Sequence, residues 1–266
     1  MQHLFQSWEL FATDVKRAEH VLLLSDYDGT LTPIMSRPDE AILSPGLRGK
    51  LGVLAEQPTF TVGIISGRSL SEIRSMVGIS GIYYAGNHGL EIEGPGVKFV
   101  SPAASSAQGT IKVLVGQLSA ALADISGVII EDKGLSLSVH YRLMAADDES
   151  QVAGVFRRLT SSLISARKIR VTSGKKVWEV RPPIDWHKGK AADAIREETK
   201  TLLKLERLLT IYLGDDTTDE DAFKVVRHPY GRSIFVGGDH STSSAGYFLD
   251  STSEVEDFLS RLLDMG

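Results

Sequence analysis

Two aspartates, Asp26 and Asp28, stand one residue apart just after the apolar run VLLLS of residues 21–25. Such a short run is typical of a buried strand, so the pair lies at the edge of the expected hydrophobic core. Ionised carboxylates are costly there unless a cation or hydrogen bonds compensate them. Alone, the D-x-D-G pattern is also typical of a turn closed by an aspartate side chain, so its chemistry depends on what else reaches this point.

Further polar side chains flank other regular segments of the chain. They are Ser66 and Arg68 after residues 60–65, Lys188 at the start of a helical stretch, and Asp215 and Asp216 after residues 210–213. Each has an ordinary explanation: a helix start for SGR, a solvated lysine, and carboxylates near a helix N-terminus capped by Thr218. That explanation does not cover Asp215 and Asp216, because they precede the cap and follow a strand.

In an open parallel sheet, ligands bind beyond the carboxyl ends of the strands, so we expect these side chains to meet. Asp26, Asp28 and Asp215 would then surround one point, an arrangement that suits Mg²⁺, which takes few carboxylates and keeps waters that a phosphate can replace. The serine, arginine and lysine would supply donors for the remaining phosphate oxygens. Since an aspartate can accept a phosphoryl group, the set predicts phosphoryl chemistry through an aspartyl-phosphate.

The segments around these residues predict an α/β fold with a parallel sheet covered on both faces. The expected strands are residues 21–25, 60–65, 82–85, 210–213, 233–236 and 246–249. Helix starts are predicted at Ser44-Pro45, at the capping box Ser69–Glu72 and at the similar box Ser253–Glu256.

Residues 105–182 follow a different pattern of helix, two strands, helix and two strands. In LSLSVHYR, Leu135 and Leu137 alternate with Ser136, Ser138 and His140. Period-two alternation with a polar side predicts antiparallel strands with one face left open by the core. We therefore expect a core domain of residues 1–104 and 183–266, and an inserted α+β domain of residues 105–182, with Gly- and Pro-rich flanks as linkers.

Composition excludes several classes of protein. The 266 residues carry a net charge of −5, which argues against a general nucleic-acid binder, and contain no cysteine, which excludes disulfides and thiolate chemistry. The N-terminal twenty residues lack the apolar core of a signal peptide, and no run is long enough to span a bilayer. We expect a cytoplasmic monomer that acts on a small molecule and binds neither nucleic acid nor membrane.

Together, DYDGT, the serine of SGR, the lysine of HKGKA and GDDTTDED resemble, in order, the motifs of the haloacid dehalogenase (HAD) superfamily of phosphatases. The sequence is similar, within that superfamily, to the trehalose-6-phosphate phosphatase family. The segments that carry this narrower resemblance are DYDGTLTPI, ISGRSL, GNHGLEI, EDKGLSLSVHYR, EVRP and LGDDTTDEDAF. The resemblance implies a HAD-like Rossmannoid core whose insert is a cap that closes over the sugar.

The resemblance also implies a role for each motif residue. Asp26 would be the nucleophile, Asp28 the general acid and then base, and Ser66 and Lys188 would hold the phosphate. The implied Mg²⁺ ligands are Asp26, Asp28 through its backbone carbonyl, Asp215 and Asp216, with Asp219 nearby.

Sugar recognition needs paired donors and acceptors for hydroxyl groups. The candidates for contact with the substrate are Gly29, Arg68, Asn87, His88, Lys133, His140, Arg142, Lys175, Glu179 and Arg181. Simpler explanations stay open, since His140 and Arg142 can form the solvated face of a strand, and Glu179 with Arg181 a surface ion pair of small energetic value.

The expected function is a Mg²⁺-dependent phosphatase that converts trehalose 6-phosphate and water into trehalose and phosphate, a step of trehalose biosynthesis. One alternative is a phosphatase of another sugar phosphate, such as glucosyl or mannosyl glycerate phosphate or sucrose phosphate. Another is a non-catalytic sugar-phosphate sensor, which predicts loss of Asp26, Asp28, Lys188 or Asp215, and all four are present.

Overall fold

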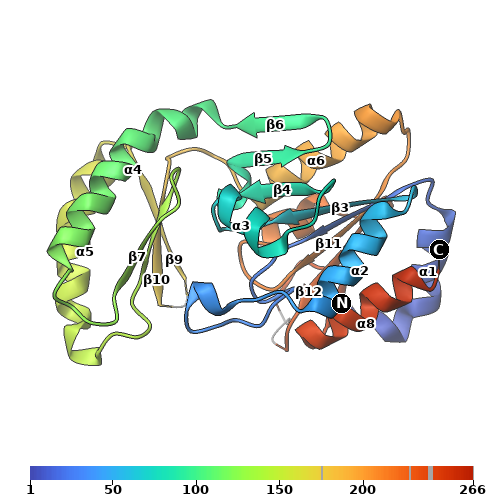
Figure 1. Cartoon of the computed structure of the whole chain (residues 1–266), viewed down its shortest axis with the longest axis horizontal. Coiled ribbons are helices and arrows are strands. Elements are labelled where there is room, and N and C mark those ends of the chain that lie inside the picture. The colour runs from blue at the N-terminus through green and yellow to red at the C-terminus, as the bar shows by residue number, and fades with distance from the viewer. Residues whose placement is uncertain (175, 228, 239–241, 266) are drawn as a thin grey trace. The chain divides into compact units, whose positions relative to one another are not determined.

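A computed structural model describes residues 1–174, 176–227, 229–238 and 242–265. The chain forms two compact units, a large unit of Met1–Phe99 with Trp186–Gly266 and a small unit of Val100–Asp185. Each unit has its own sheet (Figure 1). We describe the units one at a time.

The large unit is built on a nine-stranded sheet with the order β1-β13-β12-β11-β2-β3-β4-β5-β6. Its strands are β1 (Gln2–His3), β2 (Val21–Ser25), β3 (Phe60–Ile65), β4 (Tyr83–Gly86), β5 (Glu91–Gly94), β6 (Val97–Val100), β11 (Leu209–Gly214), β12 (Gly231–Val236) and β13 (Tyr247–Leu249). The pairs from β1 to β4 are parallel, whereas β4 and β5 are antiparallel. The predicted α/β class is confirmed.

Both faces of this sheet are buried, because successive side chains of the central strands enter opposite cores. Val21 and Leu23 of β2 belong to one apolar cluster, and Leu22 and Leu24 belong to the other. The first cluster is completed by helices α1 (Trp8–Arg17), α2 (Pro45–Glu56), α3 (Leu70–Val77) and α8 (Thr252–Leu263), and the second by α6 (Lys188–Leu203) and α7 (Glu220–Val225). Apolar runs without alternation are therefore what this sheet requires.

Two of the three predicted helix starts coincide with N-cap residues of the structure. Ser44 and Ser69 are the N-caps of α2 and α3, and their hydroxyls accept hydrogen bonds from the N–H groups of Leu47 and Glu72. The predicted start at Ser253 is wrong, since α8 begins at Thr252 after the N-cap Ser251. In place of a capping box, Glu254 Oε2 accepts a hydrogen bond from the N–H of Asp250, which places the helix start further upstream.

The small unit consists of α4 (Pro102–Ala121), β7 (Ile129–Asp132), β8 (Leu137–His140), α5 (Glu149–Ser165), β9 (Arg170–Gly174) and β10 (Val177–Arg181). This order of helices and strands is the predicted one. The strands form an antiparallel sheet in the order β7-β8-β10-β9, with a separate core around Leu137, Val139 and Phe156.

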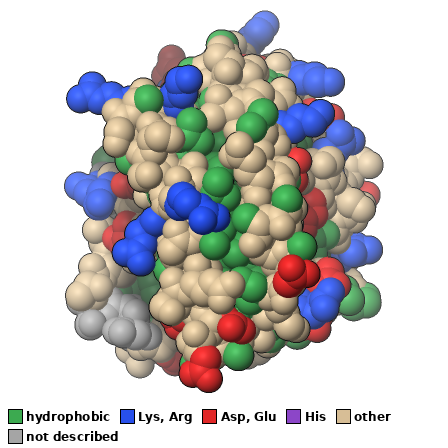
Figure 2. All heavy atoms as spheres, turned by 90° about the vertical axis from the view of Figure 1, so that its left-hand side faces the viewer, with side chains coloured by type: hydrophobic (Ala, Val, Ile, Leu, Met, Phe, Trp, Pro, Cys, Tyr) green, Lys and Arg blue, Asp and Glu red, His purple; other side chains and the backbone are tan. Residues whose placement is uncertain are grey.

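The polar face of this sheet is less open than the sequence predicts. Ser136 and Ser138 are buried, with 0% and 2% of their surface exposed. Ser138 pairs with Glu131 on one side and Glu179 on the other, so the longer carboxylate side chains flank it. The outer surface of this unit is different: apolar side chains lie between separate lysines and arginines on the left-hand side of Figure 1 (Figure 2), and Val113 of α4 is 61% exposed. Single exposed apolar residues of this kind are common on protein surfaces.

The chain leaves the large unit after Phe99 and re-enters it at Trp186. The rings of these two residues stack, with centroids 5.4 Å apart and planes 25° apart. The two crossings of the chain are thus joined at one place on the large unit. Within the described ranges, none of the helices combines the length and apolar character that a membrane crossing requires.

Candidate active site

Lys188 lies at the centre of the charged groups at the carboxyl ends of the strands. It is the first residue of α6 and is 3% exposed, so its ammonium group needs anionic partners. Its Nζ lies 2.8 Å from Asp26 Oδ1 and 2.9 Å from Asp219 Oδ1. The lysine thus joins the residue after β2 to the residue before α7, as a group that holds a nucleophilic carboxylate in place would.

The carboxylates of Asp26, Asp215 and Asp219 converge, with one oxygen of each lying within 4.8 Å of the others. The register of the sheet explains the convergence, since Ser25 pairs with Leu213 and both strands end just beyond this pair. Asp219 is held from several sides: its Oδ2 accepts bonds from the N–H groups of Asp215 and Asp216, and its Oδ1 accepts one from the Tyr212 hydroxyl at 2.6 Å.

Burial and the neighbouring charges shift the pKa values of Asp26, Asp215 and Lys188. Burial raises the pKa of Asp26 well above its usual range, an effect that Lys188 opposes and Asp219 reinforces. Burial and the neighbouring Asp219 raise the pKa of Asp215 to about 7. Burial alone would lower the pKa of Lys188, but Asp219 and Asp26 outweigh it and raise this pKa well above its usual value. The lysine is therefore a permanent cation, and it does not neutralise the cluster alone.

Gly29 allows the Asp215 carboxylate to approach the backbone closely. Its φ of +89° is one that other residues rarely adopt, and a Cβ at this position would lie 2.1 Å from Asp215 Oδ2. The cluster offers carboxylate oxygens, which are the ligands that hard divalent cations prefer. The donor atoms and the uncompensated charge together fit such a cation.

Asp216, the fourth of the predicted metal ligands, contacts its own loop through its carboxylate. Its Oδ1 accepts hydrogen bonds from both the N–H and the hydroxyl of Thr218, at 2.7 Å each. The third carboxylate of the cluster is Asp219, four residues after Asp215. Thr218 is not the cap of α7 either, because the N-cap residue is Asp219.

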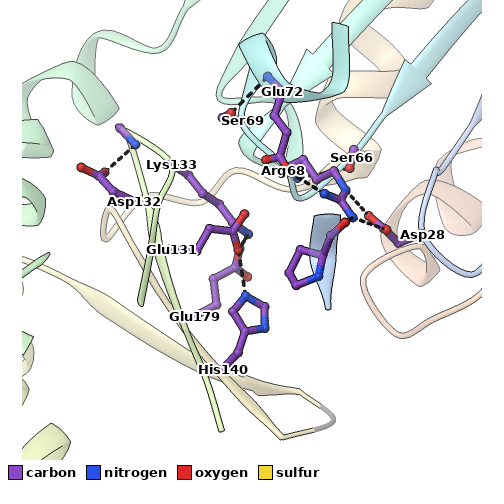
Figure 3. A network of polar contacts seen from close by, with 12 residues as sticks. Asp28, Ser66, Arg68, Ser69, Glu72, Glu131, Asp132, Lys133, His140 and Glu179 are labelled. Atoms are coloured by element: carbon purple, nitrogen blue, oxygen red, sulfur yellow. Dashed lines mark hydrogen bonds and ion pairs between the residues drawn. The ribbon is translucent and has the colours of Figure 1, made fainter. Parts of the chain in front are cut away.

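Asp28 points to a second part of the site, formed with Ser66 and Arg68 after β3 (Figure 3). The Arg68 guanidinium donates to both carboxylate oxygens of Asp28, from Nε at 2.8 Å and from Nη2 at 2.7 Å. The Ser66 hydroxyl accepts a bond from the N–H of Arg68 at 3.2 Å. Arg68 also donates to Glu72, so the predicted phosphate ligand has protein partners of its own.

The predicted sugar ligands Asn87 and His88 form a strained turn after β4. Both have positive φ, 51° and 57°, and both are buried. Their N–H groups donate to the carbonyls of Arg68 and Ser66, so the turn braces the loop that follows β3. The Asn87 amide also donates to Glu91 Oε1 at 2.7 Å. Such strain in non-glycine residues is concentrated at functional sites.

The predicted ligands of the small unit gather on the polar face of its sheet (Figure 3). Lys133 Nζ lies 3.7 Å from Glu131 and 3.8 Å from Glu179, and His140 Nε2 lies 2.8 Å from Glu131 Oε2. Arg181 is paired with Glu179. Arg142 follows β8 and is exposed, and Lys175 lies outside the described residues.

Two residues of these networks were not among the candidates: Glu131 and Tyr212. Glu131 had a signal, because it opens the segment EDKGLSLSVHYR that carries the resemblance to the family. Tyr212 had none, because an aromatic residue inside a buried strand reads as core.

The sequence matches the family model described as Trehalose-phosphatase over residues 24–253. The protein named "Probable trehalose-phosphate phosphatase D" of Arabidopsis thaliana is 37% identical over 263 residues, which cover 94% of this chain and 69% of that relative.

Solved structures of other proteins share the fold of this chain. The C. albicans trehalose-6-phosphate phosphatase C-terminal domain is 27% identical, with a TM-score of 0.78 and 97% of both chains covered. A haloacid dehalogenase-like hydrolase from Bacteroides thetaiotaomicron, 16% identical, shares the fold with a TM-score of 0.60 over 91% of this chain and 99% of its own. The predicted HAD-like fold is confirmed. Since the family model covers most of its residues, this chain belongs to the trehalose-phosphatase family of phosphoric monoester hydrolases.

Proposed function

We propose that the chain is a Mg²⁺-dependent phosphatase that hydrolyses trehalose 6-phosphate to trehalose and phosphate through an aspartyl-phosphate on Asp26. One observation carries the proposal: Lys188 Nζ lies 2.8 Å from Asp26 within the cluster of converging carboxylates. A buried carboxylate beside a permanent cation is poised to attack an anionic phosphate, because its own charge is compensated.

In the first step, an Asp26 oxygen attacks phosphorus and the bond from phosphorus to the sugar oxygen breaks. Lys188 holds Asp26 and draws the phosphate oxygens toward it, and the Ser66 hydroxyl donates to another of them. Asp28 protonates the sugar oxygen, so that trehalose leaves as an alcohol rather than as an alkoxide.

In the second step, Asp28 takes a proton from a water molecule that attacks the phosphorus of the aspartyl-phosphate. The bond from phosphorus to the Asp26 oxygen breaks, which releases phosphate and restores the carboxylate. Asp28 thus ends the cycle with the proton it gave away at the start, and the atoms balance.

Asp26, Asp215 and the backbone carbonyl of Asp28, with Asp219 in the same carboxylate cluster, are the groups that would hold Mg²⁺. When bound, Mg²⁺ neutralises charge on the phosphate oxygens. On the small unit, which we assign as the cap, Glu131, Lys133 and Glu179 provide alternating acceptors and donors for sugar hydroxyl groups.

The test is phosphate release from a panel of substrates, with Mg²⁺, with a chelator, and with Mg²⁺ restored. The panel holds trehalose 6-phosphate, sucrose 6-phosphate, glucosylglycerate phosphate, glucose 6-phosphate and 4-nitrophenyl phosphate. We expect kcat/KM for trehalose 6-phosphate to exceed that of the other sugars by about tenfold or more, since sites built for hydroxyl groups discriminate strongly. The chelator should abolish release and Mg²⁺ should restore it.

The variant Asp26→Asn serves as the control for covalent catalysis and should release no phosphate while keeping the unfolding temperature of the wild type. A preference for another sugar phosphate would reject the substrate, and activity in this variant would reject the mechanism. A wild-type chain that binds trehalose 6-phosphate without turnover would instead be a sensor.

A further inference from the structure

We propose that Glu72 and Arg68 are a positioning pair that orients the carboxyl group of Asp28 for its two proton transfers, to the oxygen of the leaving sugar and from the attacking water. This inference rests on the acid–base role proposed for Asp28 and assigns a task to Glu72, which takes no part in the reaction steps above.

The contact between Arg68 and Asp28 is bidentate. Arg68 Nε lies 2.8 Å from Asp28 Oδ2, and Nη2 lies 2.7 Å from Oδ1. Two parallel bonds to a planar guanidinium fix the plane of a carboxylate, which one bond or a lysine cannot do. The orientation of Asp28 is therefore only as well defined as that of Arg68.

The guanidinium is fixed from its other sides by the protein. Nη1 donates to Glu72 Oε1 at 2.5 Å, and Nη2 also donates to the carbonyl oxygen of Pro38 at 2.7 Å. The ring of Tyr27 lies 5.6 Å from the guanidinium carbon. Asp28 and Glu72 thus grip opposite ends of one cation (Figure 3).

The local sequence places Glu72 for this purpose. It lies in the first turn of α3, and its N–H donates to the Ser69 hydroxyl, which fixes its backbone. In a complete capping box its carboxylate would return to the N–H of Ser69. Here it contacts Arg68, four residues earlier, so the helix start holds the arginine instead.

The exposure of the three side chains shows which of them can meet a substrate. Arg68 is 6% exposed, whereas Asp28 is 40% and Glu72 is 32% exposed. The arginine is a buried support with an accessible carboxylate at each end. Since misplacement of a catalytic group by about 1 Å can cost up to about 100-fold in rate, loss of the Glu72 contact should weaken proton transfer by Asp28.

The leaving group separates positioning from a general structural role. A sugar oxygen is a poor leaving group and needs the proton of Asp28, whereas a 4-nitrophenolate leaves readily without one. A defect in the placement of Asp28 therefore slows release of the sugar in the first turnover and spares release of 4-nitrophenolate in the first turnover, before Asp28 is needed as a base. A defect in folding or in phosphate binding slows both.

The experiment compares the rate of leaving-group release in the first turnover, from trehalose 6-phosphate and from 4-nitrophenyl phosphate, for wild type, Glu72→Ala, Glu72→Gln and Arg68→Lys. We expect Glu72→Ala to lower this rate for the sugar phosphate by about tenfold, with the rate for the aryl phosphate within about twofold of wild type. Glu72→Gln should recover part of the loss, because its amide oxygen still accepts a bond from Arg68. Arg68→Lys should resemble Glu72→Ala or be worse.

The matched control is Glu93→Ala. Glu93 is also 32% exposed, and it pairs with a different arginine, Arg74 of α3, at 2.8 Å. It should leave both activities and their ratio unchanged.

Equal loss on both substrates in the Glu72 variants, or no loss on either, would overturn the positioning role while leaving the proposed function intact. A wild-type chain without turnover on either substrate would overturn the proposed function and this inference with it. Thermal unfolding of each variant identifies a folding defect, and Glu72→Gln provides the decisive ratio if Glu72→Ala does not fold.

Discussion

The hydroxyl of Tyr212 donates to Asp219 Oδ1, the same oxygen that lies 2.9 Å from Lys188 Nζ. Tyr212 is fully buried, and its ring packs edge-on against Phe223 with centroids 5.8 Å apart. Asp219 Oδ1 therefore accepts hydrogen bonds from two donors of the protein, the Tyr212 hydroxyl and Lys188 Nζ. The tyrosine fixes the carboxylate that in turn fixes the lysine beside Asp26.

The substitution Tyr212→Phe removes this bond and keeps the ring. We expect a loss of about 1–2 kcal/mol in the free energy of unfolding, because a buried carboxylate loses a donor. We also expect a lower kcat, because Lys188 is then held less firmly beside Asp26. Denaturant unfolding and phosphate release measure the two effects.

Tyr84→Phe is the control for that variant. Tyr84 is also buried, but its hydroxyl donates to the Ile79 carbonyl, away from the carboxylates. This variant should lose stability and keep its kcat. If both variants lost kcat equally, Tyr212 would have no special relation to the site.

The meeting of residues that follow the ends of parallel strands was predictable from the sequence. Asp26, Lys188 and Asp215 meet as the sequence predicts, because parallel strands deliver their carboxyl ends to one edge. The role of Asp219 was not predictable in the same way. Its spacing is also that of a helix N-terminus, and only the tertiary contacts with Tyr212 and Lys188 distinguish the two.

Among the elements, β2 and β11 position the converging carboxylates. Asp26 donates its N–H to the carbonyl of Leu213 at 2.9 Å, so the chain stays paired for one residue beyond β2. The predicted ranges of the central strands agree with the structure to within two residues, because apolar runs in a two-faced sheet have sharp ends. The start of α8 was wrong because several serines compete as caps, and only the bond from Asp250 to Glu254 decides between them.

The other end of β2 predicts a dependence of stability on pH. His20 precedes β2, is 6% exposed and lies 2.8 Å from the hydroxyl of Thr61 in β3. Burial lowers the pKa of His20 from its usual value of 6.5, although Glu19 opposes the shift. The unfolded chain therefore takes up a proton at this histidine at a higher pH than the folded chain does.

The free energy of unfolding should consequently decrease as the pH falls through 6.5. Above about pH 7.5, His20 should make no contribution to the pH dependence of this free energy. His20→Gln keeps a polar side chain and does not titrate, so we expect a smaller loss of stability between about pH 7 and pH 5. Denaturant unfolding at several pH values measures this. An unchanged slope in the variant would mean that other groups cause the pH dependence.

On the scale of the whole molecule, the chain has separate apolar cores in its two units. The change from continuous apolar runs to alternating ones predicted an insert, because a one-sided antiparallel sheet needs a different pattern from a covered parallel sheet. The burial of Ser136 and Ser138 was not predictable, since it depends on the side chains of neighbouring strands.

Separate cores predict separate responses to core substitutions. Phe156 of α5 is 5% exposed and stacks on Trp178 with centroids 4.6 Å apart. Phe156→Ala should destabilise the small unit by about 3–5 kcal/mol. Hydrogen exchange should then accelerate for amides of α4 and β8 and remain slow for amides of β2 and β11.

Phe258→Ala in α8, a fully buried residue of the large unit, is the reciprocal control. It should accelerate exchange in β2 and β11. Equal acceleration of both units in either variant would show that the chain unfolds as one cooperative body despite its separate cores.

The stack of Phe99 on Trp186 has a consequence for how such a chain can change over evolution. The stack holds the two crossings of the chain together. The small unit is therefore an insertion in the large unit whose two ends are already joined, like a closed loop. Lengthening a closed loop adds little entropic cost. A lineage can therefore exchange or remodel the small unit, while the large unit continues to fold around the same carboxylate cluster.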